Sequence, residues 1–184
     1  MQIVIPRAET AYLHVFKPQP PMKEGGEPQY SATFLWDEDT KKLAKLEAAI
    51  VEVATAKFGA KAESMLKKGQ LRSPIRPGSD KEDAKDAEAF EGKIFLTARS
   101  TDKPQVVDGD LEAVMDQLDV YSGCIGRADI WLFAYDKAGN RGVGAILNSF
   151  QKLDDGVRKS GRRPAEDAFG SEDDDDDDGD PLLK

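Results

Sequence analysis

The side chains most able to do chemistry in this chain alternate along the run 120–136, VYSGCIGRADIWLFAYD. In an extended strand, Arg127, Asp129, Trp131, Phe133 and Tyr135 all point to one face, because successive side chains point oppositely. The other face is small and aliphatic, as a core requires: Cys124, Ala128, Ile130, Leu132 and Ala134. Exposed rings beside an arginine cost hydration unless something covers them. Unpaired nucleic acid suits such a face, because its bases are flat and its phosphates are charged. Packing under a helix or a partner subunit is the alternative.

The run 93–100, KIFLTARS, repeats this chemistry. Alternation places Ile94, Leu96 and Ala98 inward. The outward set is a cation, an aromatic ring, a hydroxyl and a cation, namely Lys93, Phe95, Thr97 and Arg99. Because two separate strands have basic and aromatic outer faces, the pattern is harder to attribute to chance than on one strand.

A third group of cations falls in the run 70–91, which is rich in proline, glycine and mixed charge and lacks apolar periodicity. We expect a long exposed loop, and long loops in small domains are often functional. Arg72 and Arg76 flank Ser73, Pro74 and Ile75, where they would clamp a phosphate backbone or remain solvated surface residues.

The elements that position these residues are mainly strands. The Gly/Asn-rich run 137–142 predicts a hairpin turn between 120–136 and a second strand at 143–153. Further strands are expected at 1–6, 10–17, 30–36 and 106–107. Residues 37–40 would cap a helix that ends at Gly59, a second helix would end at Gly69, and 111–118 would form a short helix or turn.

Length and charge indicate one domain with an appendage. The last twenty residues, 165–184, hold ten of the 35 acidic and one of the 26 basic residues, which leaves 25 of each sign in the body. We therefore expect a folded domain at 1–153, and a basic linker and disordered acidic tail at 154–184, because like charges resist collapse. The single cysteine and the lack of a long apolar run or signal pattern favour a soluble intracellular protein.

Patterns typical of enzymes are weak. His14 is the sole histidine and fits an ordinary strand position, so a multi-histidine metal site is excluded. The glycines at 139–144 are better explained by the hairpin turn than by a phosphate loop. Asp108 and Asp110 are acidic enough to hold magnesium, but DGD is more typical of a turn. We expect no catalysis, no metal and no cofactor.

Taken together, the runs TAYLHVFKP, YSATFLW, KIFLTARS with KPQVVD, and YSGCIGRADIWLFAYD with GNRGVGAILNSFQKL resemble the phage-encoded single-stranded DNA-binding proteins with an OB (oligonucleotide-binding) fold. The resemblance covers roughly the whole body. It implies a mainly β barrel whose outer groove holds a DNA strand, with one or two helices inserted between strands. The usual OB helix lies between the third and fourth strands, which holds here only if 1–6 is a genuine strand.

The same resemblance implies the binding residues. Phe95, Trp131, Phe133 and Tyr135 would stack on bases, and the remaining DNA contacts would come from Tyr12, Lys17, Arg72, Arg76, Lys93, Arg99, Arg127 and Arg141. Members commonly end in an acidic stretch with a hydrophobic tip. Here the corresponding residues are Asp173, Asp174, Asp175, Asp176, Asp177, Asp178, Leu182 and Leu183, although this tip lacks an aromatic residue and Lys184 adds a positive charge.

The function expected is coating of single-stranded DNA in phage replication, recombination or repair, in the cytoplasm of a bacterial host. The acidic tail would recruit replication or recombination proteins and compete with DNA for the basic groove. The alternative is a non-catalytic protein-interaction or DNA-mimic module that uses the tail. An exposed aromatic face also suits a homodimer, and no membrane contact is expected.

Overall fold

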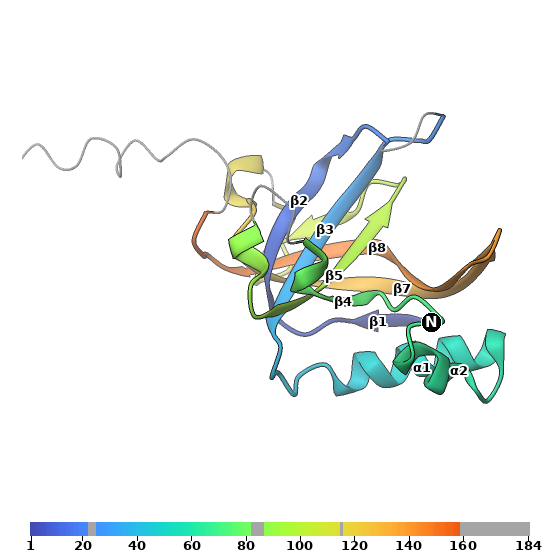
Figure 1. Cartoon of the computed structure of the whole chain (residues 1–184). Helices are drawn as coiled ribbons and strands as arrows, with labels where there is room; N and C mark the ends of the chain where they lie inside the picture. Colours follow the sequence, from blue (N-terminus) through green and yellow to red (C-terminus); the bar gives the residue numbers. More distant parts are fainter. Residues whose placement is uncertain (22–24, 82–86, 115, 159–184) are drawn as a thin grey trace, which may run out of the picture.

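Five strands close into a ring in the computed structural model, which describes residues 1–21, 25–81, 87–114 and 116–158 (Figure 1). The ring order is β2, β3, β5, β8, β7 and back to β2. The pair β5–β8 is parallel, and the other neighbours in the ring are antiparallel. The bounds are β2 Ala8–Gln19, β3 Gln29–Asp37, β5 Lys93–Ser100, β7 Ile125–Lys137 and β8 Asn140–Asp154. This order and the single parallel pair give an OB-like fold, so the predicted mainly β barrel is confirmed.

The expected strand at 1–6 exists, but it is not a separate member of the ring. Strand β1 (Gln2–Val4) pairs with residues 129–131 of β7, and β2 begins to pair with the same strand at 125–126. Between them the Ile5 N–H donates to the Ala128 carbonyl at 2.9 Å. Proline lacks an N–H to donate, so Pro6 interrupts what is otherwise one continuous edge along β7.

The helices consequently lie in an unusual place for an OB barrel. Helices α1 (Ala44–Phe58) and α2 (Ala62–Lys67) follow β3 and precede β5, between the second and third strands of the ring. They lie together in Figure 1, and α1 contacts β7 and β8. The predicted C-terminal glycines are correct, since Gly59 and Gly69 both have positive φ. The predicted cap at 37–40 is wrong, because α1 follows Leu43 and receives no side-chain cap.

The main core lies inside the ring and under α1. Phe34 at its centre is completely buried, and its ring lies 6.4 Å from Trp36 and 6.2 Å from Phe150. Leu46, Ile50 and the other buried residues of α1 belong to the same cluster. The inward residues predicted for the runs 93–100 and 120–136 face this core, apart from Ala134, which is half-buried and does not belong to the cluster.

The hairpin of β7 and β8 turns through Ala138 and Gly139, both with positive φ, between the paired residues Lys137 and Asn140. This confirms the predicted turn. The short strand predicted at 106–107 is β6 (Gln105–Val107), which pairs with β8. Of the predicted helix or turn at 111–118, only the end lies in a 3-10 turn, η3 (Gln117–Asp119), and Ala113 instead forms a bridge with Val107.

The prediction of one long loop at 70–91 is wrong. The segment contains β4 (Ile75–Pro77), η1 (Gly78–Lys81) and η2 (Ala87–Phe90). β4 pairs antiparallel with β5, and Arg72 forms an isolated parallel bridge with Gly142 of β8. These long-range pairings hold a stretch whose sequence shows no strand pattern.

After β8 the chain turns back onto Tyr121. The Tyr121 hydroxyl oxygen lies 3.1 Å from two acceptors for its one proton, an Asp155 carboxylate oxygen and the Gly156 carbonyl. The Arg158 guanidinium lies 4.0 Å from the centre of the Tyr121 ring. Hydrogen bonds from Lys152 and Tyr121 lower the pKa of Asp155. The predicted acidic tail lies outside the described residues.

Truncation of Phe34 tests the core. Phe34→Ala should lower the free energy of unfolding by about 3–5 kcal/mol, because it removes a fully buried ring and leaves a cavity. Urea denaturation measures this loss. Leu118→Ala is the control, since Leu118 is 73% exposed and its loss should change stability by less than about 0.5 kcal/mol. Equal stability of the two variants would contradict this description of the core.

Candidate nucleic-acid interface

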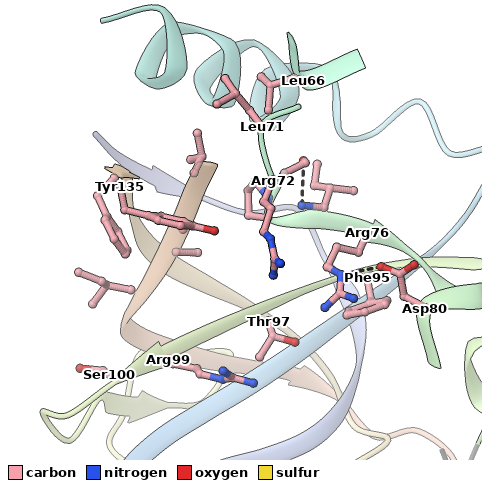
Figure 2. A pocket seen from close by; sticks show the side chains of 18 of the residues that line it. Leu66, Leu71, Arg72, Arg76, Asp80, Phe95, Thr97, Arg99, Ser100 and Tyr135 are labelled. Carbon is pink, nitrogen blue, oxygen red and sulfur yellow. Dashed lines mark hydrogen bonds and ion pairs between the residues drawn. The ribbon is translucent and has the colours of Figure 1, made fainter. Parts of the chain in front are cut away.

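An open groove of about 1010 Å³ runs along the outside of the barrel where β5 and β8 meet. One wall is the segment 71–77 with Asp80 and Lys81, and the other is the hairpin around residues 133–135 and 143–146. Residues of β5 and the turn after it, from Phe95 to Asp102, line the space between the walls. Figure 2 shows this groove from close by.

The groove exists because β5 and β8 diverge. Their backbones are in register at one pair, Arg99 with Ile146. Beyond it β4 occupies the widening gap, pairing with β5 at residues 94–96. The Arg72 N–H donates to the Arg141 carbonyl and the Val143 N–H donates to the Arg72 carbonyl, each at 2.9 Å. The wall that carries Arg72 and Arg76 is therefore fixed to both neighbouring strands.

Three of the predicted cations meet in this groove. Figure 2 shows Arg72 and Arg99 reaching into the same space from opposite sides, with Arg76 beside them. The Arg76 Nε atom is 2.6 Å from a carboxylate oxygen of Asp80, which neutralises part of the positive charge. Because the guanidinium groups have fixed charge and several donors, they suit phosphate oxygens.

Aromatic side chains complete the hairpin wall. Phe133 and Tyr135 line the groove with ring centres 6.1 Å apart. Trp131 precedes them on the same face of β7 and is 47% exposed, while Phe133 is 38% exposed. The predicted outer face of this strand is therefore correct, and its rings are accessible to a stacking partner.

Phe95 requires a correction. It does face outward from the main core, as predicted, but it is only 2% exposed. Phe90 packs edge-on against it at 5.4 Å, and Arg76 and Lys81 lie over its ring at 5.4 and 5.8 Å. Phe95, Phe90, Leu35 and Ala11 form a second small core, so Phe95 is a buried support for the groove and not an open stacking platform.

The remaining predicted contacts lie away from the groove lining. Tyr12 stacks on Phe90 at 5.8 Å beside this second core. Arg127 donates to Gln151 at 2.7 Å, towards the other end of the hairpin. Lys93 pairs with Asp37 at 2.7 Å, and this hydrogen bond lowers the pKa of the Asp37 carboxyl. Lys17 and Arg141 are exposed but do not line the groove.

Sequence reasoning missed Lys81 and Ile146. Lys81 lines the groove and lies 5.3 Å over the Tyr12 ring. It stands in a run of mixed charges, so nothing in the sequence distinguishes it from the neighbouring charged residues. Ile146 is 37% exposed and is paired with Trp131 across the hairpin. Assigning the faces of β8 from the predicted hairpin would have found it.

The described residues offer little support for a metal site or a catalytic nucleophile. In the described part of the chain no group of three or more His, Cys, Asp or Glu side chains is placed to hold a metal. Asp108 accepts hydrogen bonds from the Asp110 and Glu112 N–H groups at 2.9 Å, as in a turn. Burial raises the pKa of the Cys124 thiol and lowers the pKa of His14, which makes the first a poor nucleophile. None of the described helices is both long and apolar enough to cross a membrane.

Comparison with known proteins decides the relationship. The model of the family of the single-stranded DNA-binding protein of Enterobacter phage Enc34 matches residues 1–179. The chain belongs to this family. The chain is also similar to a phage protein, p50 of Acyrthosiphon pisum secondary endosymbiont phage 1, with 27% identity over 158 residues, which are 85% of each chain.

Solved structures show the same fold as this Enc34-family chain. The Enc34 single-stranded DNA-binding protein in complex with ssDNA is 23% identical, with a TM-score of 0.65 over 86% of this chain and 89% of that one. The gp2.5 single-stranded DNA-binding protein of bacteriophage T7 is 13% identical, with a TM-score of 0.60 over 94% and 96%. These likenesses confirm the predicted barrel fold, and the family model confirms the predicted family.

The exposure of the two tryptophans is directly measurable. Trp36 is 5% exposed and donates to the Arg7 carbonyl at 3.0 Å, whereas Trp131 is 47% exposed. Acrylamide should therefore quench the emission of Trp131 strongly and that of Trp36 weakly. Trp131→Phe should leave a blue-shifted emission that resists quenching. Strong quenching of that remaining emission would show that Trp36 is not enclosed.

Proposed function

We propose that this chain binds single-stranded DNA in the groove between β4, β5 and the β7–β8 hairpin. It would coat and protect the strand during phage DNA replication, recombination or repair. The observation that carries this proposal is the meeting of Arg72, Arg76 and Arg99 with the accessible rings of Phe133 and Tyr135 around one open groove. Membership of the Enc34 family supports the same ligand.

The aromatic rings and the cations would contact different parts of the DNA strand. Stacking on Phe133, Tyr135 and the adjacent Trp131 contributes roughly 1–3 kcal/mol per base and is largely indifferent to sequence. Arg72, Arg76 and Arg99, with Lys81, meet the phosphates, and the affinity they add falls with salt because bound counterions are released. Such a surface holds a strand without changing it, so the proposed activity is non-catalytic and needs no cofactor. It would operate in the cytoplasm of a bacterial host.

The predicted DNA-contact residues that are not accessible in the groove fall into two groups. Lys17, Lys93, Arg127 and Arg141 remain proposed contacts for a strand that extends beyond the groove. Tyr12 and Phe95 act through packing, because both lie against Phe90.

We also propose that the acidic residues Asp173–Asp178 and the tip at Leu182 and Leu183 compete with DNA for the cationic groove and, once displaced, recruit replication or recombination proteins. The charge distribution supports this, since the body is formally neutral and the tail holds the excess negative charge. Residues 159–184 can span roughly 90 Å when extended, which is enough to reach the groove from Arg158.

Binding of oligo-dT tests the proposed function. Titration should quench the Trp131 emission, and binding to a duplex of equal length should be weaker. Arg99→Ala should reduce the steepness of log affinity against log salt by about 0.7, the value of one phosphate contact to a single strand. The control Lys45→Ala removes an exposed cation of α1 outside the groove and should leave the steepness unchanged. Failure of the unaltered chain to bind oligo-dT would refute the proposal. If its fluorescence changed on mixing with another protein but not with DNA, the chain would instead be a protein-interaction module.

Truncation tests the tail. A chain ending at Pro164 should bind oligo-dT more tightly than the full chain at low salt, because a competing polyanion has been removed. The difference should shrink as salt rises and screens the charges. Fluorescence titration of both chains across a salt series measures it. Unchanged or weaker binding after truncation would count against competition, without bearing on the groove itself.

A further inference from the structure

The glycine pattern of the hairpin has a role that its turn does not explain. Gly139 lies in the turn, but Gly142 and Gly144 lie within β8, opposite Tyr135 and Phe133. Neither has a positive φ, so their backbone conformation is open to any residue. What sets them apart is the space that a side chain would need.

Gly144 makes room for a ring. A Cβ atom at this position would lie 2.7 Å from Cζ and 2.8 Å from Cε1 of Phe133. Directly paired side chains on one face of a sheet normally stand next to each other. With no side chain at 144, the Phe133 ring instead lies across β8, where it forms part of the groove wall.

Gly142 makes room for main chain. A Cβ atom there would lie 2.4 Å from the carbonyl oxygen of Arg72 and 2.7 Å from its Cβ. This close approach permits the two hydrogen bonds, each of 2.9 Å, that join Arg72 to Arg141 and Val143. Those bonds hold the Arg72 backbone against the hairpin, and its side chain then projects into the groove (Figure 2).

We infer that Gly142 and Gly144 are positioning residues for DNA binding: Gly144 seats the stacking ring of Phe133, and Gly142 seats the phosphate-binding Arg72. This inference rests on the proposed function. It assigns the two glycines separate effects, since a stack is indifferent to salt and a phosphate contact is not.

Gly144→Ala tests the first effect. The ring at the end of a flexible side chain can turn away, so the chain should fold, while oligo-dT affinity should fall about fivefold or more, as for one lost stack. The salt dependence should stay unchanged. In a Phe133→Ala background the same substitution should have no further effect, because the seated ring is already gone. A loss of affinity that is equal in both backgrounds would overturn the assignment.

Gly142→Ala tests the second effect. Its methyl group meets backbone, so the Arg72 segment must shift, and the steepness of the salt dependence should fall by about 0.7. In an Arg72→Ala background, Gly142→Ala should not reduce the steepness of the salt dependence any further. Thermal melting accompanies each measurement, and a Gly142→Ala chain without a cooperative transition would assign this glycine to folding and overturn its positioning role.

Gly109→Ala is the matched control for both variants. A Cβ atom at Gly109 meets nothing within 4 Å and the residue has no positive φ, so this variant should bind as the unaltered chain does. If the unaltered chain binds oligo-dT and the variants at 142 and 144 match this control, the inference fails and the proposed function stands. If the unaltered chain does not bind, both fail.

Discussion

The divergence of β5 from β8 is the constraint on which the rest of this structure depends. A closed ring needs every strand to have two neighbours, yet in the described residues these two strands are in register at one pair, Arg99 with Ile146. β4 fills the opening and satisfies backbone groups that would otherwise be unpaired there. The insertion brings Arg72 and Arg76 beside the hairpin, so the segment that fills the opening in the barrel also carries two cations of the groove.

Much of the barrel could be predicted from period-two patterns. Alternation in the runs 93–100 and 120–136 gave the correct outer faces, because each strand has one side on the core. β4 could not be found in this way. Three residues that include Pro77 carry no alternation, and they become a strand only by pairing with β5 from a distant part of the sequence. The place of the helices between the strands was also undecided, because it depended on whether residues 1–6 form a genuine strand.

The candidate site was predictable in its chemistry and less so in its boundaries. Trp131, Phe133 and Arg99 are exposed on the faces expected for them. Phe95 follows the same pattern but lies beneath Phe90. Facing outward from a core does not guarantee contact with solvent, because a later segment can cover a strand from outside. Lys81 shows the converse, since only the course of that covering segment brings it to the groove.

β8 also separates two ends of the molecule. Residues 143–146 line the groove, whereas Asp154 closes the strand near the Tyr121 ring that Arg158 covers. Asp154 follows Ile146 by eight residue steps of strand, a distance of roughly 26 Å at about 3.3 Å per residue. The described chain thus leaves β8 well away from the groove. A strand in the proposed groove and the last described residues, up to Arg158, would therefore lie at opposite ends of β8.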